Sequence, residues 1–258
     1  MKAGERRMER ITSSQNTLLK HIRKLQTSRA YREACGEFVA DGFKLLSEAL
    51  QWYPHLTAVV LCEGAPCPPL PPQTRCVCVP ESLMQSLSSM RTPQGVVFTC
   101  ALPKQPQLSV CRGGIVLDRI QDPGNLGTIL RTADAFGVPV LLTNNCADPF
   151  CEKTIRASMG AVLRTPPVSI PLEELLRAIA ASGVPLAATA LSERARDLRQ
   201  VDLSEYLTVI GSEGQGVCET LLRAAQSEVI IPMRPTCESL NAAVAASIVM
   251  WQLINHRK

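Results

Sequence analysis

Short apolar runs alternate with amphipathic stretches through the second half of the chain, from about residue 109 onward. Near-continuous apolar strands between amphipathic helices are typical of a parallel sheet that helices cover on both faces. We therefore predict an α/β domain over residues 109–258. Its expected strands span residues 115–119, 138–143, 185–189, 208–211 and 228–231, and its expected helices span residues 126–136, 151–163, 172–181, 219–225 and 240–254.

The first half has a different order of elements, which predicts a smaller α+β domain over residues 1–108. Strands are expected at residues 37–41, 57–63, 75–79 and 95–101, and helices at residues 43–52 and 81–90. The stretch ALPKQPQLSVCRGG at residues 101–114 is rich in chain-breaking residues, so we predict a linker with the domain boundary near Leu108. A first helical stripe is formed by Ile11, Leu18, Leu19, Ile22 and Leu25.

Composition limits the functional classes only weakly. Of the 258 residues, 46% are hydrophobic, enough for a core, and the net charge of +4 permits an RNA partner without demanding one. No run approaches the roughly 20 apolar residues of a membrane span, and the charged N-terminus lacks the apolar segment of a secretory signal. The 11 cysteines are scattered without C-x-x-C spacing. This pattern predicts thiols in a reducing, cytoplasmic setting and no metal site.

A first motif, GNLGTILRTADAFG, occupies residues 124–137. It follows an Asp-Pro dipeptide that is typical of a turn before a helix. Gly127, Arg131 and Asp134 fall on the face opposite the apolar stripe, and a glycine one turn into a helix fits the close approach of a ligand or a second backbone. The alternative is an Arg131–Asp134 surface pair on an ordinary helix.

A second motif, GSEGQG at residues 211–216, follows an apolar strand and precedes a helix. Such a loop can turn backbone amides toward a ligand. It lacks the lysine of a Walker loop and the spacing of G-x-G-x-x-G. Glu213 would repel a pyrophosphate and would better suit a cationic cofactor or an RNA hydroxyl. The alternative is a plain tight turn.

A third motif combines IPM at residues 231–233 with SLNAAVAASI at residues 239–248. Ser239 is a candidate N-cap for the last helix, and Asn241 can present its amide outward. The alternative is helix capping alone. The small residues AAVAAS indicate close packing against a neighbouring backbone.

Together, and in this order, the three motifs resemble those of the SpoU family, the S-adenosylmethionine-dependent RNA ribose 2′-O-methyltransferases of the SPOUT class. The segment DPFCEKTIRASMGAV at residues 148–162 resembles the family too. EFVADGFKLLSEAL at residues 37–50 and MRTPQGVV at residues 90–97 are similar to the substrate-binding domain of its rRNA branch. Every motif residue is present, although Ser212 stands where many relatives carry another residue.

The resemblance implies a C-terminal trefoil knot, whereas connectivity rules alone predict an unknotted sheet. It also implies S-adenosylmethionine as cofactor, no metal, and a homodimer that combines residues of both subunits in its active site. The implied catalytic residues are Arg131, Asn125, Glu213, Ser239 and Asn241, and the implied cofactor-binding residues are Thr189, Gly211, Ile231, Met233 and Leu240. The candidate RNA-binding residues are Lys20, Arg23 and Lys24 of the basic N-terminal run, for which a solvated helix face is the alternative, with Lys153 and Arg156 added by the resemblance.

The family mechanism gives Arg131 the role of general base. Because an arginine side chain keeps its proton far above neutral pH, a phosphate clamp that orients the hydroxyl is an alternative. The substrate expected from the first domain is rRNA, with tRNA as the alternative. A non-catalytic RNA-binding protein is disfavoured by the intact Arg131, Glu213 and Asn241, and a Rossmann-type oxidoreductase by the missing glycine fingerprint.

Overall fold

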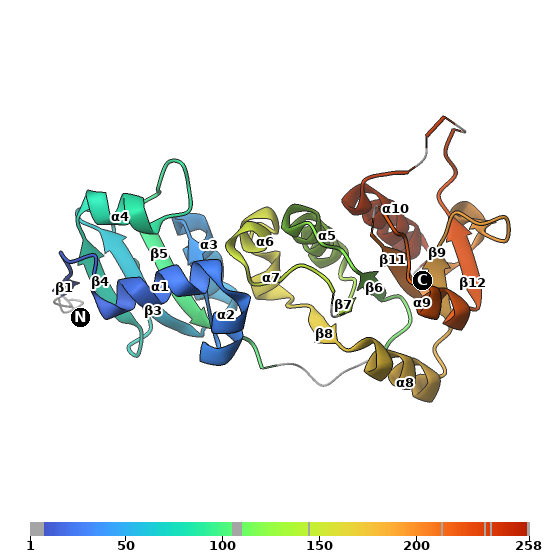
Figure 1. Cartoon of the computed structure of the whole chain (residues 1–258), viewed down its shortest axis with the longest axis horizontal. Helices are drawn as coiled ribbons and strands as arrows, with labels where there is room; N and C mark the ends of the chain where they lie inside the picture. The colour runs from blue at the N-terminus through green and yellow to red at the C-terminus, as the bar shows by residue number, and fades with distance from the viewer. Residues whose placement is uncertain are drawn as a thin grey trace. The chain divides into compact units, whose positions relative to one another are not determined.

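The computed structural model describes residues 8–104, 110–143, 145–212, 214–234, 236–237 and 239–256 (Figure 1). It forms two compact units. The first comprises Met1–Pro103 and Phe150–Arg156, and the second comprises Lys104–Pro149 and Ala157–Lys258. The predicted boundary at Leu108 lies outside the described residues and stays a prediction. None of the helices in the described ranges is long and apolar enough to cross a membrane.

The first unit is a mixed five-stranded sheet in the order β1-β4-β3-β5-β2, with helices packed against it. Strand β5 runs antiparallel to β2 and β3, whereas β4 runs parallel to β1 and β3. The strands are β1 (Glu9–Arg10), β2 (Glu37–Asp41), β3 (Leu56–Cys62), β4 (Arg75–Val79) and β5 (Val96–Ala101), and the helices are α1 (Thr17–Thr27), α2 (Arg29–Cys35), α3 (Phe43–Trp52) and α4 (Glu81–Leu87).

Helix α1 has one buried face. The Asn16 side chain caps it by accepting a hydrogen bond from the backbone N–H of Leu18 (2.9 Å). Leu19, Ile22 and Leu25 are fully buried in the core cluster. The predicted stripe is wrong at one position, because Ile11 precedes the helix, although its side chain is also in this core. Helix α2 and the short β1 were not predicted, because neither carries a long apolar period.

The second unit is a seven-stranded sheet in the order β10-β12-β9-β11-β6-β7-β8. Every pairing in it is parallel, so the predicted parallel sheet is confirmed. The strands are β6 (Ile115–Asp118), β7 (Val140–Thr143), β8 (Val168–Ile170), β9 (Leu186–Thr189), β10 (Arg196–Asp197), β11 (Leu207–Gly211) and β12 (Ser227–Ile230). The helices are α5 (Pro123–Phe136), α7 (Ala161–Arg164), α8 (Leu172–Ser182), α9 (Glu219–Ala224) and α10 (Ala242–Asn255), with 3-10 turns at Leu198–Gln200 and Leu203–Glu205.

The predicted helix over residues 151–163 is wrong, because two helices, α6 (Glu152–Ala157) and α7, take its place. Met159 and Gly160 both have positive φ angles, of 51° and 85°, and a left-handed backbone cannot continue a right-handed helix. Helix α6 belongs to the first unit. There the rings of Phe38 and Phe150 lie 5.1 Å apart, and Gln26 Nε2 donates to Glu152 Oε1 (3.4 Å).

Strand β11 is inserted between β9 and β6 in the sheet. Both of these strands come before β11 in the chain, and β6 comes much earlier than β9. Helices α8 and α9 place Leu175, Ile179 and Leu221 against one face of this sheet. Helices α5 and α10 pack on each other, on the side of the sheet away from α8 and α9 (Figure 1). Since all seven strands are parallel, the carboxyl ends of β6, β9, β11 and β12 reach one edge, where ligands bind in open α/β sheets.

Candidate functional site

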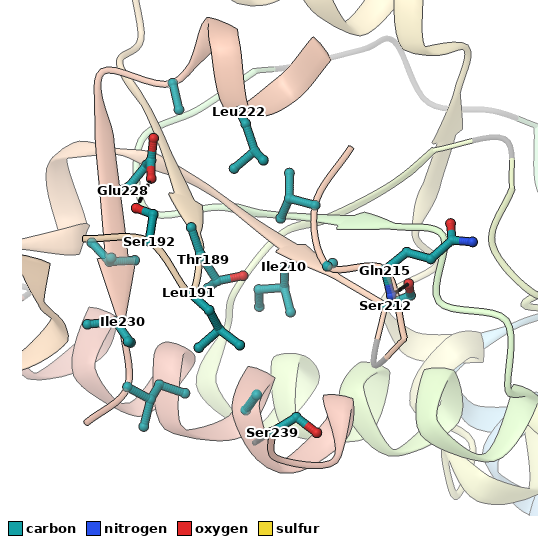
Figure 2. A pocket seen from close by; sticks show the side chains of 18 of the residues that line it. Thr189, Leu191, Ser192, Ile210, Ser212, Gln215, Leu222, Glu228, Ile230 and Ser239 are labelled. Atoms are coloured by element: carbon teal, nitrogen blue, oxygen red, sulfur yellow. Dashed lines mark hydrogen bonds between the residues drawn. The ribbon is translucent and has the colours of Figure 1, made fainter. Parts of the chain in front are cut away.

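A cavity of about 900 Å³ opens at the carboxyl ends of β9, β11 and β12. Leu191, Ile210, Leu222 and Ile230 make its apolar walls (Figure 2). The structure brings together every residue that the sequence analysis assigned to the cofactor, because Thr189, Gly211, Ile231, Met233 and Leu240 all line this cavity. Ser239, assigned to catalysis, lines it as well.

The carboxylate of Glu228 is a largely buried polar group in the cavity wall. Glu228 is only 14% exposed and accepts hydrogen bonds from Ser192 Oγ and from Arg194 Nη2 (3.2 Å). These donors offset part of the cost of holding a charged group away from water. The sequence analysis missed Glu228 and Ser192, because neither belongs to a motif.

The loop after β11 folds back on itself. Ser212 and Gly216 exchange backbone hydrogen bonds of 3.2 and 2.9 Å, and the Gln215 N–H donates to Ser212 Oγ (3.3 Å). A Cβ atom at Gly211 would lie 2.1 Å from the carbonyl carbon of Gly216. The resemblance implied Gly211 as a cofactor-binding residue, and the returning backbone of the loop by itself already excludes any side chain at this position. Glu213 lies outside the described residues, so its catalytic role stays a prediction.

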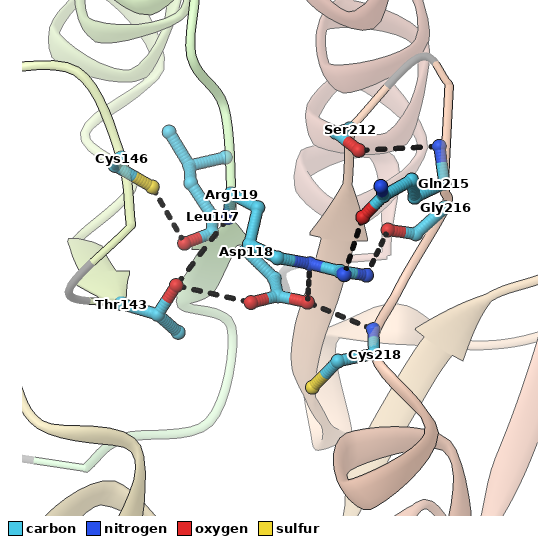
Figure 3. Close-up of polar contacts among 9 residues, drawn as sticks. All are labelled: Leu117, Asp118, Arg119, Thr143, Cys146, Ser212, Gln215, Gly216 and Cys218. Carbon is cyan, nitrogen blue, oxygen red and sulfur yellow. Dashed lines mark hydrogen bonds and ion pairs between the residues drawn. The ribbon is translucent and has the colours of Figure 1, made fainter.

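Asp118, at the end of β6, fastens this loop to the sheet (Figure 3). It is 2% exposed, and its carboxylate accepts hydrogen bonds from Thr143 Oγ1 (3.0 Å) and from the backbone N–H of Cys218 (2.8 Å). The sequence carried one signal for it, a lone carboxylate closing the apolar run IVLD, which the motif analysis did not use.

Arg119 continues the same network (Figure 3). Its Nε lies 3.4 Å from Asp118 Oδ2, its Nη1 donates to Gln215 Oε1 (2.8 Å), and its Nη2 donates to the Gly216 carbonyl oxygen (3.1 Å). The backbone of Arg119 has a φ of 59°, a left-handed conformation that costs a residue with a side chain about 1–2 kcal/mol. The surrounding contacts must therefore hold it there.

Two cysteines, Cys146 and Cys218, lie beside this network. Burial raises the pKa of the Cys146 thiol, which donates to the Leu117 carbonyl oxygen (3.2 Å). Burial, and after it the charge of Asp118, raises the pKa of the Cys218 thiol. Both thiols therefore stay protonated near neutral pH, and a thiolate mechanism is disfavoured. Within the described ranges, no group of three or more His, Cys, Asp or Glu side chains could hold a metal ion.

The structure also brings together two predicted catalytic residues that are far apart in the sequence. Asn241 Nδ2 donates to Asn125 Oδ1 (3.1 Å). Asn241 is at the same time the N-cap of α10, because its Oδ1 accepts from the N–H groups of Ala243 (2.9 Å) and Val244 (3.3 Å). The prediction that Ser239 caps this helix is therefore wrong.

A second hollow, a groove of about 560 Å³ between α5 and α10, contains this asparagine pair. Thr128, Thr132 and Trp251 also line it. The first cavity reaches Leu240, next to Asn241 in the chain, so the two hollows meet at the start of α10.

Arg131 is exposed on α5 and lines neither hollow. The alternative of an Arg131–Asp134 pair is wrong, because the Asp134 Oδ2 accepts from Arg164 Nε (2.9 Å) and Nη2 (2.8 Å). Arg131 makes no hydrogen bond or ion pair to another described residue. The sequence analysis had placed Gly127 with Arg131 on the face opposite the apolar stripe. The structure shows instead that Gly127 is buried. The Arg131 guanidinium is thus available to an incoming group.

The predicted RNA-binding residues all lie in the first unit. Lys20 and Lys24 are exposed on α1, one turn apart, and Arg23 between them donates to the Ser14 carbonyl oxygen (2.9 Å). Lys153 and Arg156 are exposed on α6. They share one unit with the α1 cations because α6 packs there and not with the sheet that follows it.

Two family profiles match the chain. Residues 114–251 match the SpoU rRNA Methylase family, and residues 16–97 match the MRM3-like substrate binding domain. The first match covers the cavity, the asparagine pair and Arg131. The second covers α1 to α4 and β2 to β4 of the first unit and ends within β5.

Relatives align over nearly the full length of the chain. The 23S rRNA (guanosine(2553)-2'-O)-methyltransferase RlmP of Bacillus subtilis (strain 168) is 33% identical over 250 residues, 95% of this chain and 99% of that protein. The 23S rRNA (uridine(2479)-2'-O)-methyltransferase of Streptomyces viridochromogenes is 26% identical, over 96% of this chain and 92% of its own. The crystal structure of AdoMet-bound rRNA methyltransferase from Sinorhizobium meliloti has a TM-score of 0.84 at 29% identity, covering 97% and 99% of the two chains.

Fold and site together define an S-adenosylmethionine-dependent RNA 2′-O-ribose methyltransferase. The chain belongs to the SpoU rRNA methylase family. This confirms the family expected from the three motifs. It also confirms the knotted parallel domain, which the resemblance implied and the periodicity could not reveal.

The cavity fits S-adenosylmethionine in both size and chemistry. Its volume of about 900 Å³ is near the upper end of the range for small-ligand pockets, roughly 300–1,000 Å³. Apolar walls such as Ile210 and Leu240 can receive a purine, and backbone groups at the ends of β9 and β11 can receive polar groups. Glu228 adds a carboxylate to the polar part of the lining, where it is paired with Arg194.

Gly211 and Gly214 provide a matched test of the loop. Gly211→Ala places a methyl group against the Gly216 backbone, so we expect S-adenosylmethionine affinity to fall at least about tenfold as the loop is pushed open. Gly214→Ala in the same loop meets nothing within 4 Å and should retain most of the affinity. Calorimetric titration measures both, and equal affinities for the two variants would contradict this role of the fold-back.

Proposed function

We propose that this chain methylates the 2′-hydroxyl of one ribose in ribosomal RNA, and that it works as a homodimer. The observation that carries the proposal is the convergence of three strand ends, β9, β11 and β12, on one cavity beside the hydrogen-bonded Asn125–Asn241 pair. Family membership supports the chemistry. The rRNA named as the substrate of full-length relatives, together with the substrate-binding domain match, supports the choice of RNA.

When bound, S-adenosylmethionine supplies a methyl group on a positively charged sulfur, which is already a good leaving group. The protein must then bring a ribose hydroxyl into line and remove its proton. Thr189, Gly211 and Leu240 hold the cofactor in this proposal. Asn125 and Asn241 present amide groups beside it, and Ser239 adds a hydroxyl at the rim.

Arg131 is proposed to clamp the phosphate of the target nucleotide. Its guanidinium is exposed and unpaired among the described residues, and Asp134 is neutralised by Arg164 and so does not compete for it. A guanidinium binds a phosphate through two parallel hydrogen bonds, which fixes the orientation of the adjacent ribose. A clamp of this kind also avoids the cost of deprotonating an arginine.

A homodimer is supported by an unusual apolar stripe. Val244, Ile248 and Trp251 recur at helical spacing on α10 and are 49%, 36% and 55% exposed. Phe136 of α5 extends the stripe, with its ring 5.9 Å from that of Trp251. An exposed apolar patch of this kind marks an interaction surface, and a second copy of the chain can cover it. The small residues Ala243 and Ala246, expected to pack closely against a neighbouring backbone, are buried within the subunit and lie outside this stripe.

The proposed dimer gives Arg131 a position from which it can act on the partner's cavity. Arg131 does not line the cavity of its own subunit, but α5 carries it beside the groove that adjoins the apolar stripe. Contact across the stripe can therefore bring Arg131 of one subunit to the cavity of the other. We propose that each active site joins the cavity of one subunit to Arg131 of its partner.

Arg131→Ala tests the catalytic role. The side chain is exposed, so the free energy of unfolding should change by less than about 0.5 kcal/mol. Cofactor affinity should stay near that of the parent, while formation of 2′-O-methylnucleosides in rRNA falls at least about 100-fold. Arg131→Lys should keep weak activity with a raised KM for RNA if the residue is a clamp, and should show a shifted pH–rate profile if it is a base.

Arg177→Ala is the matched control, because Arg177 is an exposed arginine on α8 with no proposed role. It should leave turnover unchanged. Full methylation by Arg131→Ala would remove Arg131 from the mechanism under both accounts.

Trp251→Glu tests the apolar stripe. A charge in the centre of a buried interface is costly, so we expect this variant to sediment as a monomer and to lose methyl transfer while remaining folded. Trp52 is 53% exposed in the first unit and provides the control. Trp52→Glu should leave the dimer intact. A Trp251→Glu variant that sediments like the parent would refute the proposed interface.

Lys20→Glu combined with Lys24→Glu tests the RNA surface. If these side chains contact phosphates, the plot of log affinity for rRNA against log salt should become shallower by about 1–2 units. Lys44→Glu is the control, because Lys44 is exposed on α3 in the same unit. An equal change of slope in the control, or none in the double variant, would return α1 to a merely solvated face.

A further inference from the structure

Arg119 has no assigned part in binding or catalysis, yet it connects the end of β6 to the loop that lines the cofactor cavity (Figure 3). We propose that Arg119 is a positioning residue that holds Gln215 and Gly216, in the loop after β11, in the conformation that binds the cofactor. This inference rests on the proposed function, because it assigns that cavity to S-adenosylmethionine.

The Arg119 guanidinium extends from the end of β6 to one turn of the loop after β11. Its two terminal nitrogens donate to Gln215 Oε1 (2.8 Å) and to the Gly216 carbonyl oxygen (3.1 Å). Both Gln215 and Gly216 line the cavity. One guanidinium therefore donates hydrogen bonds to a side chain and to a backbone group of the same turn, and its planar shape fixes the spacing of these two groups.

The guanidinium is itself held in place. Its side chain is only 24% exposed, and Nε lies 3.4 Å from the buried carboxylate of Asp118. The backbone N–H of Arg119 donates to Thr143 Oγ1 (3.3 Å), whose hydroxyl also donates to Asp118. Asp118 meanwhile accepts from the Cys218 N–H, directly after the loop. The loop is thus fixed from both sides, by Asp118 behind it and by Arg119 over its turn.

The left-handed backbone conformation of Arg119 is not explained by packing alone. A φ of 59° is a conformation that glycine adopts readily and arginine adopts at a cost. A residue chosen for the backbone here would be glycine or asparagine. An arginine in this conformation is explained by what its side chain reaches, and the side chain reaches the cavity loop.

Arg119→Gly separates positioning from stability. Glycine relieves the left-handed strain, which offsets the lost contacts, so the melting temperature should stay close to that of the parent. The closed loop should become a minor state, and the dissociation constant and KM for S-adenosylmethionine should rise at least about tenfold. The kcat at saturating cofactor should change far less. A role confined to stability would instead lower the melting temperature and leave KM unchanged.

Arg119→Lys supplies the graded variant. It keeps a cation beside Asp118 and one donor toward the loop but loses the fork, so its KM for the cofactor should lie between those of the parent and Arg119→Gly. Arg112→Ala is the control, because Arg112 is an exposed arginine paired with Glu205 and does not reach the loop.

Hydrogen exchange of the cofactor-free protein tests Arg119 independently of the cofactor assignment. The amides of Ser212, Gln215 and Gly216 are hydrogen bonded within the fold-back, so they should exchange faster in Arg119→Gly and at the parent rate in Arg112→Ala. Unchanged exchange in Arg119→Gly would overturn the inference. If exchange rises but the parent itself binds no S-adenosylmethionine, the cofactor proposal fails and the loop-holding role stands.

Discussion

The insertion of β11 between β6 and β9 is the constraint on which the site depends. It puts the ends of β6, β9 and β11, which are far apart in the chain, side by side at one edge of a parallel sheet. Asp118, Thr189 and Gly211 are the last residues of these strands. The residue that anchors the loop, a residue of the cavity lining and the residue at which the loop begins therefore lie close together. No local propensity could produce this arrangement, because it follows from the order in which strands pair.

The loop after β11 shows how that constraint becomes a binding surface. The chain must reverse immediately at Gly211, where a Cβ atom would meet the Gly216 backbone, and Asp118 and Arg119 then hold the reversed segment. A buried carboxylate is costly unless its oxygens are satisfied, and Asp118 is satisfied by a hydroxyl, an amide and a guanidinium. The network therefore stabilises the loop against the end of β6.

Much of this molecule was predictable from the sequence, and the failures have physical causes. The bounds of β2, α3 and β4 agree with the apolar pattern to the residue, because each element is delimited by glycine, proline or polar residues. The residues assigned to the cofactor came from the resemblance to the SpoU motifs, and all of them line one cavity because three strand ends meet there. The Asn125–Asn241 contact and the hidden face of Gly127 were not predictable, because they depend on how α5 and α10 pack. Arg119 was missed because its role comes from a positive φ angle and a partner almost a hundred residues away, as its bond to Gly216 spans 97 positions.

The central proposal is that each active site combines the cavity of one subunit with Arg131 of the other, so that both act on the same ribose. Co-expression of Arg131→Ala with Gly211→Ala as differently tagged chains tests it most directly. At a cofactor concentration that saturates the parent but not Gly211→Ala, each variant alone should have little activity, but a heterodimer would contain one site with both defects and one with neither. Purified mixtures should then recover methyl transfer to rRNA at about a quarter of the parent rate, as random pairing of two subunits requires. Mixtures as inactive as the two variants alone would contradict the shared site and place Arg131 and the cavity in the same subunit's chemistry.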